Sequence, residues 1–555
     1  MTSSLVSCAR CAHPVLSSFK ENFNTVHSAL DETTPTITTF LETNTYPTSL
    51  QYGTLCALRA TVENTLHEID IIMAHLEHER HRLLDIHESH LRVISPIRRL
   101  PTEILAEIFA AATTSFYPVF DPHNRDGPWP LSRVCARWRA VAIRYCPEMW
   151  NNMDISYKVT PKNLGALLRL VFSRCRDGPL YIRIGIICHP IFAVVSTVTQ
   201  ESSRWRSFEI YYANDQLMDA LGAIRELKLD ILESLSIRLH HVFDPKLITT
   251  FETAPSLKAV ELRGASGGMR IALPFSQLQS YIDDGGHEMR GVSSARYFLD
   301  ILKKSPQLLK FHAGGDSVLH EFLTANPVVA PPLLHESLEE LSLYDPMLLR
   351  SIVLPALRIM TLGHPYRAYK IPLLALSEMI ARSSCSLTSL SLRNIAFDDQ
   401  GTSHWRDILD LTPCLTKLEV IMLHSYGNTS TFLSSLIEGL DEKGDSSDDL
   451  VRYDIVPLLT DLAIKVADEA DEEGVYHNFL NSDFVDMVAW RYRWAALRNV
   501  CVVVRGEDKG RDFWEFRSNE FEFLNGLKSE GLRICVFKER DGRGKRVDCL
   551  ATEVA

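Results

Sequence analysis

The sequence lacks a long apolar run of the kind that crosses a membrane. A membrane-spanning helix needs about 20 consecutive, predominantly apolar residues. The most apolar stretch, residues 180–198, is interrupted by Arg183, His189 and Pro190, so it predicts a buried strand, a turn and the start of a helix. The opening residues, MTSSLVSCAR, also lack the basic start and apolar core of a secretory signal. We therefore expect no membrane partner and a cytoplasmic or nuclear location.

Positive charge is scarce as well. The 555 residues include 58 Lys and Arg against 70 Asp and Glu, which gives a formal net charge of −12. A protein that binds nucleic acid through phosphate contacts needs clustered Lys and Arg. The charge balance therefore argues against a nucleic-acid partner.

Paired cysteines and convincing catalytic motifs are also missing. The 12 cysteines are scattered singly through apolar segments, which is typical of reduced thiols that pack as small hydrophobic groups. Cys8, Cys11 and His13 lie close together, but no second Cys or His pair follows at zinc-site spacing. The glycine-rich stretch at residues 264–268, GASGG, lacks the Lys-Ser/Thr of a phosphate loop and predicts a turn. We expect no metal, no cofactor and no catalytic residue, although a site assembled from residues far apart in sequence would leave no such motif.

The first part of the chain predicts a flexible leader followed by a long helix. Residues 1–50 are rich in Ser, Thr and Asn and contain several prolines, so we expect them to be a flexible leader. From Leu55 to Ile86, apolar residues recur at alternating three- and four-residue steps, which predicts a long amphipathic helix over 51–94.

The apolar side of this predicted helix is interrupted at Thr65 and Glu79, so we expect it to pack within its own chain or to associate weakly. Its histidines, including His78 and His81, lack acidic or cysteine partners. We interpret them as solvent-facing residues and not as metal ligands.

Residues 95–150 predict two apolar helices separated by an insertion. The segment SPIRRLPTEILAEIF places Pro101 at a first helical turn and arranges Ile104, Leu105, Ile108 and Phe109 as an apolar stripe. After the insertion, PLSRVCARWRAVA repeats the spacing with four further apolar residues, and PEMW follows. The second group comprises Leu131, Val134, Cys135 and Trp138.

This order of a Leu-Pro step, a short helix, Val-Cys-x-x-Trp and a closing Trp resembles an F-box. The string is also similar to the expanded F-box family of mushroom-forming fungi, although the insertion FYPVFDPHNRDGPWP is longer than the usual connection between these helices. The resemblance implies a non-catalytic receptor that binds a Skp-type adaptor and, through it, a cullin. It also implies an adaptor-binding surface formed or supported by Leu100, Pro101, Ile104, Leu105, Ile108, Phe109, Leu131, Val134, Cys135 and Trp138.

After Trp150 the sequence repeats Leu-x-x-Leu-x-Leu units, with other apolar residues at some positions. Their central residues include Leu235, Val260, Leu341, Met360, Leu390, Leu418, Leu462 and Val500, with weaker units at Tyr281 and Phe311. The pattern resembles an irregular α/β leucine-rich-repeat-like solenoid over 151–555, and a non-repetitive α/β domain with leucine-rich strands is the alternative. The fold class expected for the whole chain is therefore α+β and multidomain.

Residues between the buried positions of these units are expected to face a protein substrate that the sequence does not identify. We expect Glu261, Arg263, Ser342, Tyr344, Ser391 and Arg393 to contribute to this face. The function predicted from the resemblance is the substrate-recognition subunit of a Skp-cullin-F-box ubiquitin ligase. The alternatives are a leucine-rich-repeat interaction scaffold that is not linked to ubiquitination and an enzyme whose site leaves no motif.

Overall fold

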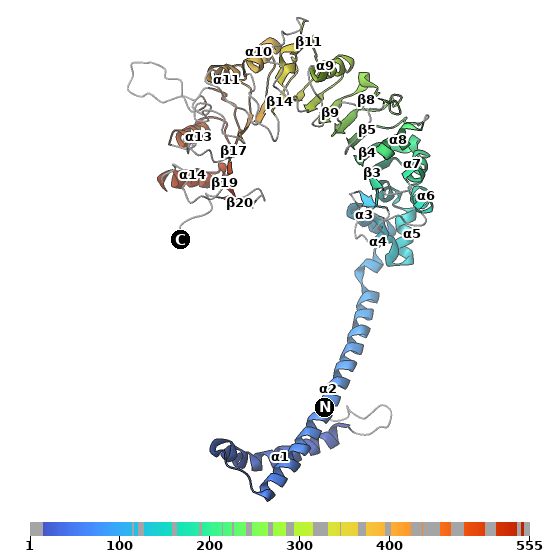
Figure 1. Cartoon of the computed structure of the whole chain (residues 1–555), viewed down its shortest axis with the longest axis vertical. Helices are drawn as coiled ribbons and strands as arrows, with labels where there is room; N and C mark the ends of the chain where they lie inside the picture. The colour runs from blue at the N-terminus through green and yellow to red at the C-terminus, as the bar shows by residue number, and fades with distance from the viewer. Residues whose placement is uncertain are drawn as a thin grey trace. The chain divides into compact units, whose positions relative to one another are not determined.

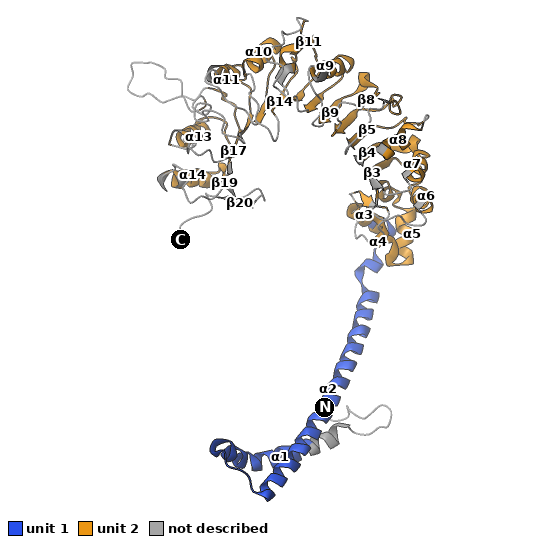
Figure 2. Cartoon of the chain, in the orientation of Figure 1, with its two compact units in different colours: residues 1–104 blue, residues 105–555 orange. Residues whose placement is uncertain are grey.

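The computed structural model describes residues 15–113, 116–119, 127–157, 164–187, 191–213, 215–224, 227–239, 247–264, 270–284, 293–314, 331–343, 346–363, 373–393, 401–422, 436, 455–467, 482–505, 518–540 and 545–548. The chain divides into two compact units, Met1–Ile104 (unit 1) and Leu105–Ala555 (unit 2), which Figure 2 shows in different colours. The chain is α+β, with helices in both units and a large parallel sheet in unit 2.

Unit 1 contains two packed helices, α1 (Val15–Thr43) and α2 (Ser49–Ile94), followed by the short 3-10 helix η1 (Pro96–Arg99). Thr48 begins α2 with a capping box: its hydroxyl accepts a hydrogen bond from the Gln51 amide at 3.4 Å, and the Gln51 side chain accepts one from the Thr48 amide at 3.0 Å. The long helix predicted over 51–94 is thus confirmed.

The expectation of a flexible leader over residues 1–50 is wrong for the part that forms α1. Pro35 lies inside this helix, and several threonines donate to the carbonyl four residues earlier, for example Thr33 to Ala29 at 2.7 Å. Val26 of α1 and Thr65 of α2 are buried, so the two helices stabilise each other by packing. Tertiary contact therefore outweighs the weak helix propensity of a Thr-rich segment.

The start of unit 2 is a group of short helices. They are α3 (Thr102–Ala112), whose first residues belong to unit 1, then α4 (Pro128–Val134), α5 (Ala136–Arg144) and the 3-10 helix η2 (Pro147–Trp150). The sequence predicted one helix through Val134 and Trp138, but the backbone of Cys135 is extended, with φ −160° and ψ 172°. The Cys135 thiol instead accepts a hydrogen bond from the Trp138 amide and caps α5.

The rest of unit 2 is built on a 16-stranded sheet in the described part of the chain. Neighbouring strands follow one another in sequence, and all pair in parallel except β19 and β20, which are antiparallel. The strands are β1 (Tyr117–Pro118), β2 (Asn152–Tyr157), β3 (Leu180–Ile187), β4 (Trp205–Ala213), β5 (Ser234–Leu239), β7 (Ala259–Arg263), β9 (Ser280–Asp284), β10 (Lys310–Gly314), β12 (Glu340–Leu343), β14 (Ile359–Leu362), β15 (Ser389–Arg393), β16 (Lys417–Met422), β17 (Asp461–Ala467), β18 (Asn499–Arg505), β19 (Arg533–Arg540) and β20 (Lys545–Asp548).

Helices between the strands cover one face of this open sheet, on its outer side in Figure 1. They are α6 (Leu164–Arg174), α7 (Ile191–Thr199), α8 (Asp215–Gly222), α9 (Ser293–Lys304), α10 (Leu373–Ser383), α11 (Gly401–Asp410), α13 (Ser482–Trp494) and α14 (Ser518–Glu530), with 3-10 helices η3 (Ser202–Arg204), η4 (Phe275–Gln277) and η6 (Pro346–Ser351). Two small parallel sheets join β6 (Leu247–Ile248) to β8 (Arg270–Ile271) and β11 (Leu333–Leu334) to β13 (Ile352–Val353).

The predicted leucine units lie on the strands of the large sheet. Their central residues pair in register from strand to strand, so that Leu235 is beside Val260, Val260 beside Tyr281, and Tyr281 beside Phe311. These side chains are all buried. The strand positions predicted from the repeated spacing are confirmed, and apolar strands that the spacing did not mark, such as β3 and β4, extend the same sheet.

A ladder of three threonine hydrogen bonds also links the starts of four successive strands, β14 to β17. The Thr388 hydroxyl donates to the Arg358 carbonyl at 3.1 Å, Thr416 donates to Thr388 at 2.9 Å, and Thr460 donates to Thr416 at 2.9 Å. Each threonine directly precedes a strand, so its side chain fastens the start of one strand to the start of the previous one.

Asp283 breaks the apolar pattern of the buried strand positions. It pairs in register with Leu262 and Ala313 and is 1% exposed. The Tyr281 hydroxyl donates a hydrogen bond to its carboxylate at 3.0 Å. Burial dominates and raises the pKa of Asp283 to about 7.

Replacing Asp283 by Asn should stabilise unit 2 in a pH-dependent way. The folded-state pKa lies above the value of 3.8 for an ordinary Asp, so ionised Asp283 destabilises the fold above pH 7 and the penalty shrinks as the pH falls towards 4. We expect Asp283→Asn to be more stable than the natural chain at pH 8 by up to a few kcal/mol, and no more stable near pH 4. Thermal unfolding between pH 4 and pH 8 measures the stability difference, with Asp300→Asn on α9 as an exposed control. A gain in stability of Asp283→Asn that is the same at pH 4 and at pH 8 would contradict the prediction.

Candidate functional site

Trp150 is the centre of the contacts between the short helices and the first strands of unit 2. Its indole is fully buried and donates a hydrogen bond to the Ala142 carbonyl of α5 at 2.9 Å. The Trp129 ring packs edge-on against it at 5.2 Å, and the Arg174 guanidinium lies 4.4 Å from its ring centroid. The carbonyl of Trp150 accepts hydrogen bonds from Tyr117 and Cys175.

The insertion between the predicted helices contributes to the same core. Its residues Tyr117 and Pro118 form β1, which pairs in parallel with β2 through Met153 and Asp154. Tyr117 is 1% exposed, and its ring lies edge-on to Trp150 at 6.1 Å. Gly127 at the end of the insertion has φ +83°, and a Cβ there would overlap Tyr117. The insertion therefore begins the sheet and joins it to the helices, a role that the sequence did not reveal.

The apolar stripe predicted on α3 separates into a buried and an exposed part. Leu105 and Phe109 are fully buried, with the Phe109 ring 4.9 Å from that of Trp138. Ile104 and Ile108 are 48% and 42% exposed. Leu105 and Phe109 belong to the core, so of the two expected roles, forming or supporting an adaptor-binding surface, they fit the supporting one, and the surface itself stays a prediction.

The other residues expected to bind an adaptor differ in their exposure. Val134 is 59% exposed, Cys135 is exposed, and Leu131 and Trp138 are half-buried. In unit 1, Pro101 is exposed and Leu100 is half-buried. Within unit 2, Ile108, Val134 and Cys135 are thus the expected contact residues that are exposed.

Parallel pairing in register also aligns side chains on the face of the sheet opposite the helices. We call one such line the central row; it contains the residue between the last two apolar positions of each unit. The structure brings the expected residues Glu261, Ser342 and Ser391 into it. The whole row is Asp154, Arg183, Glu209, Ser236, Glu261, Ile282, His312, Ser342, Thr361, Ser391, Glu419, Ala463, Cys501 and Cys535.

The expected substrate-facing residues are spread along the sheet. With neighbouring strands about 4.8 Å apart, Glu261 and Ser391 lie roughly 25 Å from each other. Arg263 and Arg393 lie two residues further along their strands, and Tyr344 falls outside the described residues. His312 and Glu419 occupy the same position in their units as Ser342 does in its own. The repeated spacing could therefore have predicted them too, although they were not among the expected residues.

A charged cluster surrounds Glu419 in the central row. The Lys465 ammonium lies 2.7 Å from its carboxylate, the Ser391 hydroxyl donates at 2.8 Å, and Arg393 lies at 3.8 Å. Burial opposes ionisation of Glu419, but these hydrogen bonds and positive charges outweigh it and lower the pKa of the carboxyl. Arg263 is likewise paired with Glu261. Both expected arginines are therefore held in place by acidic side chains of the sheet.

His312 lies between these paired groups. Burial lowers its pKa, and the positive charges of Arg263, Lys310 and Arg393 act in the same direction against the opposing charge of Asp284. The imidazole is therefore held neutral in a cationic part of the face.

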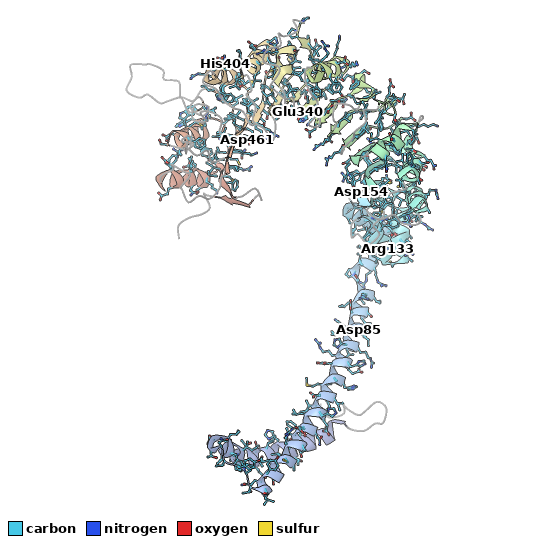
Figure 3. The ribbon with its side chains drawn as sticks, in the orientation of Figure 1. Asp85, Arg133, Asp154, Glu340, His404 and Asp461 are labelled. Carbon is cyan, nitrogen blue, oxygen red and sulfur yellow. The ribbon has the colours of Figure 1, made fainter. Side chains whose placement is uncertain are left out.

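A second cluster lies at the first strands, around Asp154, which Figure 3 labels. Tyr211 donates to both carboxylate oxygens of Asp154, at 2.9 and 3.1 Å, and Arg183 pairs with Glu209 at 2.8 Å. Burial raises the pKa of Asp154 despite these favourable contacts. Phe116 from the insertion packs against the Arg183 guanidinium at 4.3 Å, which ties the insertion to this face.

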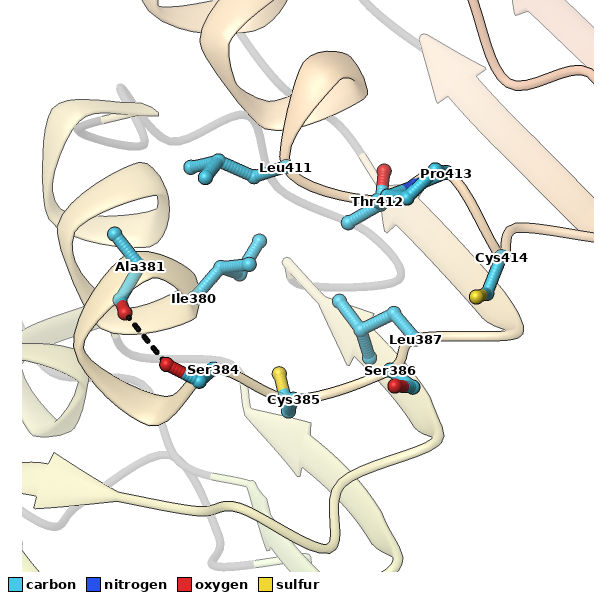
Figure 4. A pocket seen from close by; sticks show the side chains of 10 residues that line it. All are labelled: Ile380, Ala381, Ser384, Cys385, Ser386, Leu387, Leu411, Thr412, Pro413 and Cys414. Atoms are coloured by element: carbon cyan, nitrogen blue, oxygen red, sulfur yellow. Dashed lines mark hydrogen bonds between the residues drawn. The ribbon is translucent and has the colours of Figure 1, made fainter.

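A pocket of about 230 Å³ lies between the turns that precede β15 and β16. Figure 4 shows its lining, in which Cys385 and Cys414 accompany Ile380, Leu387 and Leu411. Burial raises the pKa of Cys385, so its thiol remains protonated. The pocket lining contains no acidic, basic or imidazole side chain, and it does not provide the groups that activate a nucleophile.

The GASGG stretch follows β7 and fits the G-x-S-x-G spacing of hydrolase nucleophiles. In that motif a helix follows the serine, whereas here strand β8 follows. Ser266 itself, like the Cys8, Cys11 and His13 group, falls outside the described residues.

The described residues contain no group of three or more His, Cys, Asp or Glu side chains arranged to hold a metal ion. His81 hydrogen-bonds to the Glu77 carbonyl of its own helix at 2.7 Å. In the same part of the chain, no helix has the length and apolar character needed to span a bilayer. Comparison with known proteins finds no family model that matches the chain and no similar protein among the curated ones.

Two neighbouring residues of α3 provide a direct test of how the apolar stripe is divided. Phe109→Ala should lower the free energy of unfolding of unit 2 by about 3–5 kcal/mol, because it leaves a cavity against Trp138. Ile108→Ala should change it by less than about 0.5 kcal/mol, since this side chain is half in solvent. Chemical denaturation measures the free energy of unfolding of each variant. An equal loss of stability in the two variants would contradict the assignment of Phe109 to the core and Ile108 to the surface.

Proposed function

We propose that the chain is the substrate-recognition subunit of a Skp-cullin-F-box ubiquitin ligase. One observation carries the proposal: the helices α3 and α5 bury Leu105, Phe109 and Val141, yet Ile108 on α3 and Val134 on α4 remain exposed. A helical group that buries Leu105 and Phe109 needs no further apolar residues on its surface for stability. Exposed apolar side chains on an otherwise closed module fit a binding surface for another protein.

In this proposal the strand domain is a leucine-rich-repeat-like solenoid that recruits a protein substrate. Support comes from the sequential order of the parallel strands, each with buried apolar residues at repeated positions. The central row and the adjacent Arg263 and Arg393 form the proposed recognition face, where charged and small polar groups suit a protein surface. Ubiquitin transfer belongs to the partner enzymes, and the protein acts in the cytoplasm or nucleus.

The adaptor contact is tested by placing charges at the exposed apolar positions of unit 2. Ile108→Asp combined with Val134→Asp should reduce co-purification of a Skp-type adaptor and its cullin at least 10-fold, because a buried unpaired carboxylate disfavours an interface by about 2 kcal/mol or more. Phe192→Asp is the matched control, since Phe192 is 60% exposed on α7.

The control should keep full adaptor recovery, and circular dichroism should show all variants folded. Adaptor recovery that is equal in the double variant and the control would reject the F-box assignment and favour a scaffold outside the ubiquitin system.

The substrate face is tested separately by Arg263→Ala combined with Arg393→Ala. Both changes remove a cation from the proposed recognition face, so captured partners should decrease while adaptor recovery stays unchanged. Lys303→Ala with Lys304→Ala on α9 removes the same charge from the helix-covered side and controls for it. Quantitative mass spectrometry of pull-downs measures the captured partners. If both double variants captured the same partners in the same amounts, the proposed recognition face would be wrong.

A further inference from the structure

Helix α2 carries an apolar seam along its length, but only the first part is covered within unit 1. Side chains at alternating three- and four-residue steps lie on one side of a helix. In the first part, Thr65 is buried and Leu58, Val62 and Ile69 are partly buried. After Ile72 the same spacing continues through six residues that we call the distal seam: Leu76, Glu79, Leu83, Ile86, His90 and Val93.

The apolar residues of the distal seam face solvent in unit 1. Leu76, Leu83 and Val93 are 59%, 62% and 63% exposed, and Ile86 is 41% exposed. Figure 3 shows the side chains around Asp85 projecting from α2 with no other described helix of unit 1 beside them. An exposed apolar row of this kind, broken only by Glu79 and His90, marks an interaction site.

We propose that a second copy of the chain covers the distal seam, with the two α2 helices antiparallel. The alternating spacing is the one that lets side chains of one helix fit between those of another. Antiparallel pairing centred between Leu83 and Ile86 places Leu83 opposite Ile86 of the second copy. It also places Leu76 opposite Val93. A two-fold axis relates the copies, so the pairing closes at a dimer.

The two polar residues of the seam specify the direction of the pairing. In the antiparallel arrangement Glu79 lies opposite His90 of the second copy, which pairs an acidic group with a hydrogen-bond donor. In a parallel arrangement Glu79 lies opposite Glu79 and His90 opposite His90. Like charges facing each other across a seam are unfavourable, so charge complementarity selects the antiparallel form.

Contacts within the chain are compatible with this arrangement. Arg82 pairs with Glu79 at 3.2 Å from the adjoining side of the helix, which reduces the cost of bringing the carboxylate into an interface. Ile94, which is 60% exposed, lies beside the seam and extends the apolar surface.

The length of the seam sets the expected strength of the dimer. At 1.5 Å per residue, Leu76 to Val93 spans roughly 26 Å. The resulting interface is smaller than the standard size of about 800 Å² per partner. We therefore expect a dimer that dissociates on dilution, with Kd in about the micromolar range.

Sedimentation equilibrium of the full chain over a wide concentration range tests the dimer. Leu83→Glu introduces a charge into the centre of the seam in both copies and should raise the dimer Kd at least about 10-fold. Ala74→Glu introduces the same charge on the opposite side of the same helix and should leave Kd unchanged. A natural chain that is monomeric at every concentration, or an equal effect of the two variants, would overturn the proposal.

An exchange of the two polar residues tests the direction. Glu79→His alone places two histidines opposite each other and should weaken the dimer several-fold. Adding His90→Glu restores an acid opposite a histidine in the antiparallel register and should recover the natural Kd. In a parallel dimer Glu79→His replaces a facing pair of glutamates and should not weaken the dimer. A single variant that is not weakened, or a double variant whose Kd is not recovered, would therefore reject the antiparallel register.

Discussion

The burial of Trp150 is the interaction that joins the short helices of unit 2 to the start of its sheet. The indole joins α5 through its hydrogen bond to Ala142, and its carbonyl accepts hydrogen bonds from Tyr117 of the insertion and Cys175 after α6. Helices and sheet therefore share one core at this end of the unit. This core holds the helices α3 to α5 in a fixed position relative to the start of the sheet. A partner bound to the helices would therefore be held in a fixed position relative to the strand face.

The sheet places two different kinds of chemistry on its faces. Apolar residues in register fill the side covered by helices, and the central row lines the other side, where charged and small polar groups predominate from Asp154 to Glu419. Glu261 and Glu419 pair with Arg263, Arg393 and Lys465, so the arginines are oriented before any partner arrives. Preorganised charges lose less conformational entropy on binding, and a partner with acidic groups would meet cations that are already positioned.

Periodicity made the long helix and the leucine-bearing strands predictable, because each buried face repeats at a fixed spacing. The spacing could not show which residues of a stripe are buried: Leu105 and Ile108 belong to the same pattern, and only tertiary packing, which buries Leu105, distinguishes them. Strand β1 was missed because two residues carry no periodic signal. Helix α1 was missed because Pro35 and the threonines disfavour a helix locally, whereas contact with α2 stabilises it. The central row required the strand register, which no single unit reveals.

The proposed function depends on docking of a Skp-type adaptor to the helices of unit 2. The most direct measurement is isothermal titration calorimetry of the purified full chain with a purified adaptor. We expect saturable binding with one adaptor per chain and a negative heat-capacity change, because apolar side chains such as Ile108 and Val134 leave water. The absence of detectable binding at adaptor concentrations up to about 100 µM would contradict the proposed docking site. This limit corresponds to a binding free energy of about −5.5 kcal/mol.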